Sequence, residues 1–321
     1  MEQEKKKTTF RNSVRLVGYL KETTLEEKVS QSGKHFITGN ITVALDEFNT
    51  HRVRFVVFKE DNADKYASLS KFLPANTVSI ASYLKATPTA NFTTASAMAA
   101  KIWVMATMEE FASRSGEKEK SMMMLKGFSI GLVDAEKPFV PTAAFEADAY
   151  IDSIEDELDD DDTVTGRLLI GAILPAYKGM VYRIPLVAPV EDNIAKYMKK
   201  VYKVGDTARL SGRLVAMRVQ LANEEETETE FFGKVDEQQY TTRFVREIII
   251  EKGPKTPIAQ GEEGSISSES IKNGLALREV EMDKNGQKKS VAQSQPDESK
   301  PAEAPVAKTN TAASNNEDFD F

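Results

Sequence analysis

The sequence of 321 residues contains no cysteine and only two histidines, His35 and His51. Without cysteine the chain can form neither a disulfide nor a thiolate metal site, which fits a reducing compartment. Two histidines disfavour an imidazole-based zinc centre and a Ser-His-Asp triad. No apolar run is long enough to span a bilayer, and the first residues, MEQEKKKTTF, lack the apolar segment of a secretory signal. We therefore expect a cytoplasmic protein without a metal or another cofactor and without a membrane partner.

The net charge of -8 at pH 7 conceals a segregated distribution. Residues 146–162 contain 10 acidic side chains and no basic one, and residues 224–237 contain 7 acidic side chains and Lys234. Residues 254–321 add 12 acidic and 8 basic side chains. The rest of the chain has 33 basic side chains against 21 acidic ones, and this basic excess is compatible with a polyanionic partner.

Three segments near the N-terminus alternate apolar and polar residues as half-buried strands do. They span residues 13–20, 36–45 and 52–58. The alternation puts Phe36, Arg52 and Arg54 on the outer face of adjacent strands. An exposed ring beside fixed positive charge suits a stacked base and its phosphate. The alternative is an ordinary solvated sheet face with one exposed aromatic side chain.

The segments that follow complete the pattern of a small barrel. Residues 62–73 predict a short helix with Asn62 as its N-cap and Tyr66 in the core. The further predicted elements are a fourth strand over residues 78–84, a loop over 87–99, and strands over 101–111 and 122–133. Three strands, a short helix and two further strands follow one another in an oligonucleotide/oligosaccharide-binding (OB) barrel.

Two segments carry a resemblance to a known family. Residues 13–20, SVRLVGYL, resemble the first strand of bacterial and phage single-stranded DNA-binding proteins, which follows a V-x-L-x-G-x-L pattern. Residues 73–80, LPANTVSI, resemble the K-G-x-x-V-x-V-x-G segment before the fourth strand of that family, with Ala75 and Ser82 in place of its glycines. The resemblance implies an OB fold that binds single-stranded DNA without catalysis.

A second unit repeats this plan further along the chain. Residues 204–214, VGDTARLSGRL, match the fourth-strand segment of the family better than the first unit does. Asp192 is the predicted cap of a helix, as Asn62 is in the first unit. The two copies align without gaps, Thr77 on Thr207, Ile80 on Leu210 and Leu84 on Leu214. This constant offset indicates an internal duplication.

The acidic run at residues 152–162, between the two units, has two interpretations. Carboxylates could hold a divalent cation or serve a metal nuclease. Consecutive like charges repel one another, however, and cannot all point at one ion. We therefore favour a linker between two folded units.

Hydrophobic periodicity ends at residue 254, and Ser, Gly, Pro, Ala, Gln, Glu and Lys dominate from there on. We expect this segment to be disordered because it has too little apolar mass to offset chain entropy. The chain ends in Glu317, Asp318, Phe319, Asp320 and Phe321. These residues resemble the acidic tip through which the same family recruits replication and repair proteins, but they lack its usual I-P-F ending.

Together these patterns predict a mainly β protein of two OB-fold-like five-stranded barrels, each with a short helix. The expected segments are a flexible arm over residues 1–11, the first barrel over 12–142, an acidic linker over 143–162, the second barrel over 163–253 and a disordered tail over 254–321. The predicted nucleic-acid contacts are Arg15, Tyr19, Phe36, Arg52, Arg54, Tyr83, Lys85, Phe92 and Trp103 in the first barrel, and Tyr177, Lys178, Arg183, Arg209 and Arg213 in the second.

The function that these predictions imply is to coat and protect single-stranded DNA during replication, recombination or repair, in a bacterial cell or a phage-infected host. The C-terminal tip would recruit partner proteins. Two alternatives stay open, an RNA-binding or chaperone-like OB protein and a non-catalytic structural or adaptor protein, and so does assembly into a homo-oligomer.

Overall fold

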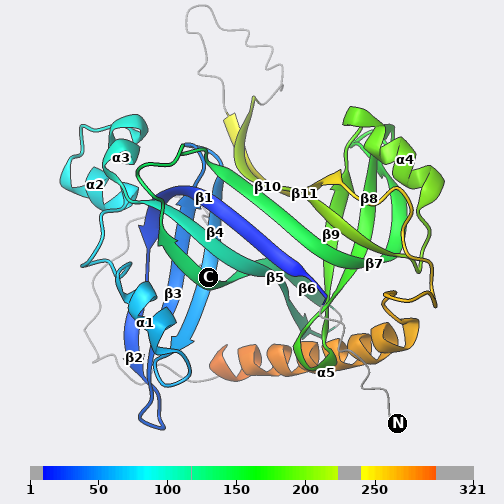
Figure 1. The fold of residues 1–321 in the computed structure, drawn as a ribbon, viewed down its shortest axis with the longest axis horizontal. Helices are drawn as coiled ribbons and strands as arrows, with labels where there is room; N and C mark the ends of the chain where they lie inside the picture. The colour runs from blue at the N-terminus through cyan, green and yellow to red at the C-terminus, as the bar shows by residue number, and fades with distance from the viewer. Residues whose placement is uncertain (1–9, 117, 223–239, 294–321) are drawn as a thin grey trace, which may run out of the picture.

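The computed structural model describes residues 10–116, 118–222 and 240–293, and its strands join in one 11-stranded sheet (Figure 1). The first part of the chain forms β1 (Asn12–Thr23), β2 (Glu26–Val29), β3 (His35–Ala44), β4 (Thr50–Phe58), α1 (Ala63–Ser70), α2 (Ile80–Ala86), α3 (Phe92–Met98), β5 (Lys101–Ser115) and β6 (Lys118–Leu132). The second part forms β7 (Thr142–Leu158), β8 (Val164–Pro175), η1 (Tyr177–Gly179), β9 (Val181–Ala188), η2 (Glu191–Asn193), α4 (Ile194–Val201), β10 (Thr207–Ala222), β11 (Tyr240–Lys252) and α5 (Ser268–Gln293). Within these ranges no helix is both long and apolar enough to cross a membrane.

Five strands of the first part close into a ring. β1 pairs with β3, β3 with β4, β4 with β6, β6 with β5, and β5 with β1. Only β4 and β6 run parallel in this ring. Leu16, Ile41 and Phe55 are among the side chains that fill the interior, each at most 1% exposed. Gly127 is required where β6 passes the Phe55 ring, because a Cβ at that position would lie 2.2 Å from Phe55 Cζ.

Helix α1 follows the third strand of this ring, where the sequence predicts a helix. Asn62 is its N-cap, since the Asn62 side-chain oxygen accepts a hydrogen bond from the backbone N–H of Lys65 at 2.9 Å. Tyr66 and Leu69 are buried against the barrel interior. The predicted cap and the predicted core position of Tyr66 are therefore confirmed.

The second part repeats the ring with the same strand order. β7 pairs with β8, β8 with β9, β9 with β11 in parallel, β11 with β10, and β10 with β7. Helix α4 precedes the fourth strand here and buries Ala195 and Met198. The prediction of a mainly β chain with two OB-like five-stranded barrels is confirmed.

A ladder between the first strands of the two rings joins the barrels. Residues 12–17 of β1 pair antiparallel with residues 142–147 of β7 (Figure 1). The expected linker over 143–162 is instead part of strand β7 as far as Leu158. Its acids alternate with core residues such as Ala147, Ala149 and Ile151, and the high local charge concealed this strand pattern. The sheet is continuous across the junction between the two barrels. The division of the chain into separate domains stays a prediction.

Residues 78–84 differ from the expected fourth strand. Ser79 begins helix α2 with a capping box, in which the Ser79 and Ser82 side chains each bond to the other residue's backbone. Asn91 caps α3 within the expected loop 87–99, and β5 takes the fourth-strand position. The gap-free alignment of the two copies is therefore wrong, because Ile80 lies in a helix while Leu210 lies in strand β10.

The expected cap of the second helix also differs. Asn193 rather than Asp192 occupies the N-cap position of α4, and it makes no side-chain capping hydrogen bond. Asp192 lies one residue earlier, in η2, with a positive φ of 53°.

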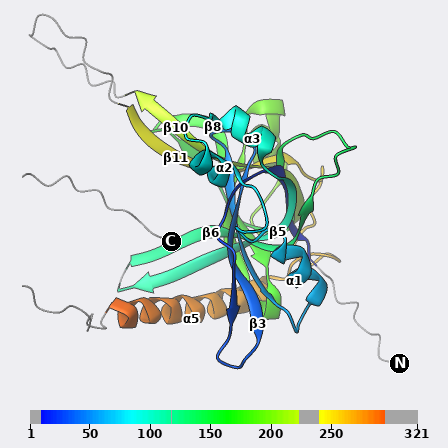
Figure 2. The same cartoon turned by 90° about the vertical axis from the view of Figure 1, so that its left-hand side faces the viewer.

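The segment after residue 254, expected to be disordered, is ordered as far as α5. Ile258 exchanges two 2.8 Å backbone hydrogen bonds with Thr207 of β10. Helix α5 then packs along β5 and β9, next to the long β5–β6 hairpin (Figure 2). Its buried positions Ile271, Gly274, Arg278 and Met282 recur at helical spacing. The glycine and the arginine among them interrupt the apolar pattern, so the stripe could not be recognised in the sequence. The acidic tip lies outside the described residues, as do the acidic stretch 224–237 and most of the N-terminal arm.

Candidate nucleic-acid interface

The outer surface of strands β3 and β4, here called the β3–β4 face, contains the predicted aromatic and basic side chains. Phe36 lies opposite Phe58, Asn40 opposite Arg54, and Thr42 opposite Arg52. The intervening residues, including Ile37, Ile41, Val53 and Phe55, point into the barrel and are at most 1% exposed. The predicted assignment of these side chains to the two faces is therefore confirmed.

An aromatic pair lies at one end of the β3–β4 face. The Phe36 and Phe58 rings stack with their centroids 5.0 Å apart and their planes at 27°. Both side chains remain partly accessible to solvent. The pair provides an apolar surface on which an unpaired base can stack.

Two arginines at the other end of the face carry exposed positive charge. Arg52 and Arg54 alternate with the buried His51, Val53 and Phe55, and both are exposed. Within the described residues, neither guanidinium makes an ion pair or a side-chain hydrogen bond with the protein. Both are therefore available to a phosphate group.

The positive charge extends to neighbouring strands. Lys126 of β6 is the register partner of Arg54, and it also pairs with Glu109 at 3.2 Å. Arg15 of β1 is exposed and, like Arg52 and Arg54, forms no ion pair within the described residues. Lys85, also predicted to contact nucleic acid, is exposed in the last turn of α2.

The other predicted aromatic contacts of the first barrel are packed into the protein. Tyr19, Tyr83 and Phe92 pack on a small buried cluster beneath α2 and α3 that contains Ile80 and Ala95. Tyr19 also meets Phe139 edge to face, with ring centroids 4.9 Å apart. Trp103 covers Gly131, where a Cβ would lie 2.7 Å from the indole ring. The half-buried positions of Tyr19, Tyr83, Phe92 and Trp103 explain them as packing residues, and their contact with nucleic acid stays a prediction.

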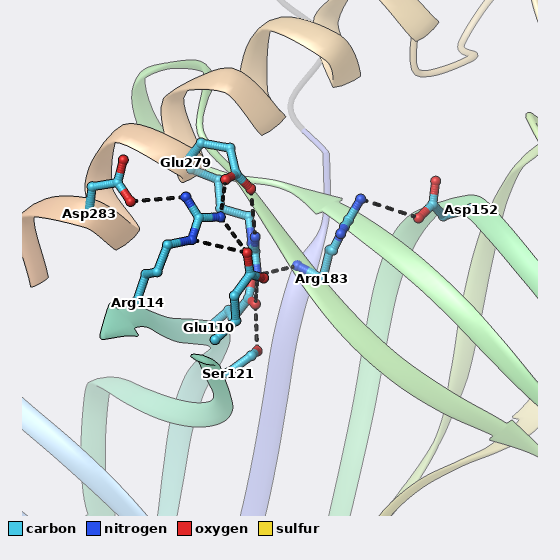
Figure 3. Close-up of polar contacts among 9 residues, drawn as sticks. Glu110, Arg114, Ser121, Asp152, Arg183, Glu279 and Asp283 are labelled. Atoms are coloured by element: carbon cyan, nitrogen blue, oxygen red, sulfur yellow. Dashed lines mark hydrogen bonds and ion pairs between the residues drawn. The ribbon is translucent and has the colours of Figure 1, made fainter. Parts of the chain in front are cut away.

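The predicted arginines of the second barrel, unlike those of the β3–β4 face, have acidic partners. Arg209 binds both oxygens of Asp148, at 2.7 and 3.0 Å. Arg213 pairs with Glu251 at 2.6 Å. Arg183 lies 3.9 Å from Asp152 (Figure 3). These partners reduce the net positive charge that the second barrel offers to a polyanion on these strands.

Tyr177 and Lys178 lie in the turn between β8 and β9. Tyr177 is 82% exposed, and the ammonium group of Lys178 lies 5.3 Å from the centre of its ring. Lys178 has a φ of 59°, the left-handed conformation that this tight turn requires. The pair is accessible but lies on a different element from the three predicted arginines of this barrel.

The sequence predictions overlooked the partly accessible Phe58 and the exposed Phe244 and Arg246. Phe244 of β11 is 44% exposed, and the Arg246 guanidinium carbon lies 4.9 Å from the centre of its ring. The alternation of Phe244 and Arg246 with Val245, near the end of the predicted second barrel, was the signal that could have identified these two residues.

The interaction of α5 with the barrels centres on a buried ion pair. Arg278 donates to both oxygens of Glu110, at 2.8 and 2.6 Å, and the two side chains are 7% and 2% exposed. Ser121 and the backbone N–H of Arg183 also donate to Glu110. Burial alone would raise the pKa of Glu110, but these hydrogen bonds lower it below its ordinary value. This pair thus connects α5, the first barrel and β9 of the second barrel.

An outer set of ion pairs surrounds this buried one. Arg114 of β5 binds Glu119 of β6, and it reaches Glu279 and Asp283 of α5 at 2.5 and 3.0 Å (Figure 3). The side chains of this set are more exposed than those of the Glu110–Arg278 pair.

Comparison with solved structures gives distant likenesses. The wild-type single-stranded DNA binding protein from Thermus aquaticus aligns with 80% of this chain and 98% of its own chain, at 12% identity and a TM-score of 0.43. A deletion mutant of that protein aligns over the same shares, at 13% identity and a TM-score of 0.44.

Comparison with protein sequences gives one family. No curated protein sequence matches the chain. The profile of the family described as YorF matches residues 11–288, which include both barrels and most of α5. The chain therefore belongs to the YorF family.

Proposed function

We propose that this chain binds single-stranded DNA without catalysis and coats exposed strands during replication, recombination or repair. The observation that carries the proposal is the β3–β4 face, where stacked Phe36 and Phe58 lie on the same surface as Arg52 and Arg54, whose guanidiniums have no ion-pair partner in the part of the chain that the structure describes. Stacking requires a free base face, which the interior of a duplex does not offer. The arrangement therefore favours a single strand over a duplex.

The two kinds of side chain contribute in different ways. Arg52 and Arg54 contact phosphates, which every nucleic acid has, and so supply affinity that decreases with salt. Phe36 and Phe58 contact bases through their faces, which all bases share, and so supply a preference for unpaired strands with little sequence selectivity. A protein that covers strands of any sequence needs this combination.

The acidic tip completes the proposed role. Residues 317–321 surround two phenylalanines with acids, which suits a small apolar pocket rimmed by Arg or Lys on a replication or recombination protein. The protein would act in the cytoplasm of a bacterial or phage-infected cell.

A titration with labelled oligonucleotides tests the proposal. Matched single-stranded DNA, duplex DNA and single-stranded RNA are each titrated with the wild-type chain and with an R52A/R54A variant. We expect the tightest binding to single-stranded DNA and a marked loss in the variant. An R167A variant is the matched control, because Arg167 is already paired with Glu157 and Glu247.

Three results would contradict the proposal. Equal affinity for duplex and single strand would remove the role of stacking. Tighter binding to RNA than to DNA of the same sequence would favour the RNA-binding alternative. Unchanged binding of R52A/R54A would favour the structural or adaptor alternative.

A further inference from the structure

A direct contact lies between the β3–β4 turn of the first barrel and the β10–β11 hairpin of the second. Asn49, just before β4, forms a β-bridge with Met217 of β10. The side-chain oxygen of Asn49 accepts a hydrogen bond from the backbone N–H of Ala216 at 3.1 Å. The strand that carries Arg52 and Arg54 therefore begins directly against the second barrel.

Arg246 lies at this contact. It is the register partner of Ala216, which Asn49 binds. Burial, followed by the positive charge of Arg246, lowers the pKa of His51, the second residue of β4, to about 4. Arg246 and the start of β4, the strand that carries Arg52 and Arg54, thus lie at the same contact between the barrels.

Phe244 and Arg246 offer the same chemistry as the β3–β4 face. Phe244 is 44% exposed, and Arg246 lies over its ring at 4.9 Å. Among the described residues Arg246 has no carboxylate partner, unlike Arg209 and Arg213 of the same barrel. A cation beside an exposed ring can receive a phosphate and a stacked base.

We propose that Phe244 and Arg246 bind the same DNA strand as the β3–β4 face, so that one strand passes from the first barrel to the second across the Asn49 contact. This inference rests on the proposed function. It assigns to the second barrel a nucleic-acid contact on β11, while its predicted arginines on β9 and β10 are held by acids.

The rigid joint explains why the two contacts would act together. The β1–β7 ladder, the Asn49 hydrogen bond and helix α5 hold the two barrels at a fixed separation. A strand bound to the first barrel therefore reaches Phe244 and Arg246 in an intramolecular step. The second contact increases the affinity only for a strand long enough to span both.

Oligothymidylates of graded length test this inference. A single OB barrel covers about 4–16 nucleotides, so we use strands of about 6 and about 30 nucleotides. We expect F244A and R246A to weaken binding of the long strand about 5-fold or more, and to leave binding of the short strand unchanged. F244Y, which keeps an aromatic ring, should bind both strands as the wild type does. Arg167 is paired with Glu157 and Glu247, so R167A is the matched arginine control, and thermal melting of each variant tests whether the fold is intact.

Several results would overturn the inference. If F244A and R246A bind the long strand as the wild type does, while R52A/R54A weakens both lengths, the strand does not cross and the proposed function still holds. Equal losses on short and long strands would also exclude a length-dependent crossing. If the wild-type chain binds neither strand, the proposed function fails as well.

Discussion

The buried pair of Glu110 and Arg278 gives the sharpest stability prediction. Replacing Arg278 by Met keeps much of the side-chain volume but leaves Glu110, 2% exposed, without its guanidinium. Removing one partner of a buried ion pair costs roughly 3–5 kcal/mol. Ser121 and the backbone N–H of Arg183 still donate to Glu110, so we expect the lower end, about 3 kcal/mol. In a chain of this size, with an unfolding entropy of about 2.1 cal/mol/K per residue, such a loss lowers Tm by roughly 4–6 °C.

Urea denaturation followed by circular dichroism measures this loss, and its pH dependence provides a second test. Because the pKa of Glu110 is lowered in the folded state, the pair stabilises the fold above the ordinary value of 4.5. This stabilisation disappears as pH falls through the folded pKa. The difference between wild type and R278M should therefore be largest near neutral pH and shrink on acidification below 4.5.

Two variants serve as controls. R114A removes the partly exposed outer ion pairs of α5. It should lower the free energy of unfolding much less than R278M does. An E110Q/R278M double variant should recover part of the loss, because no buried charge remains. The reasoning is refuted if R278M and R114A destabilise the protein equally, or if the effect of R278M is the same at pH 7 and at acidic pH.

Three further predictions concern binding. Phe36→Ala should weaken single-stranded DNA binding by about 1–3 kcal/mol in a fluorescence titration, whereas Tyr66→Ala should mainly lower Tm; the reverse pattern would contradict the assignment of faces. Binding should decrease with salt with a slope of about -0.7 in log K per phosphate contact, and replacing Arg52 and Arg54 by Ala should reduce the slope by about 1.4; a flat salt response would exclude phosphate contacts. Removal of residues 318–321 should preserve folding and leave the affinity for DNA equal or slightly higher. The truncated chain should no longer capture partner proteins in a pull-down. If it captures the same partners as the full chain, another segment recruits them.

The sequence predicted the features that depend on local patterns. Alternation with a period of two places each side chain of a strand on a definite face, so Phe36, Arg52 and Arg54 could be assigned outward before the fold was known. The cap at Asn62 and the core position of Tyr66 follow from spacing within a single turn. The strand order of two OB-like barrels followed from the succession of such elements.

Features that depend on distant or ambiguous signals could not be predicted in the same way. The apolar spacing of residues 78–84 fits both a strand and a short helix, and the capping box of Ser79 and Ser82 decides for the helix. The arginines of the second barrel resembled those of the first in sequence. Their acidic partners come from other strands, as Arg209 and Asp148 show at a separation of 61 residues.

The β1–β7 ladder also has a consequence for synthesis on the ribosome. Asn12 finds its partner at Ala147, so one edge of β1 has no neighbour until more than a hundred further residues have been made. At about 5–20 residues per second, this interval lasts roughly 7–27 seconds. During that time an apolar strand edge with Val14 and Leu16 on it can pair with other nascent chains. We expect the yield of soluble protein to depend on translation speed and on chaperones that protect such edges.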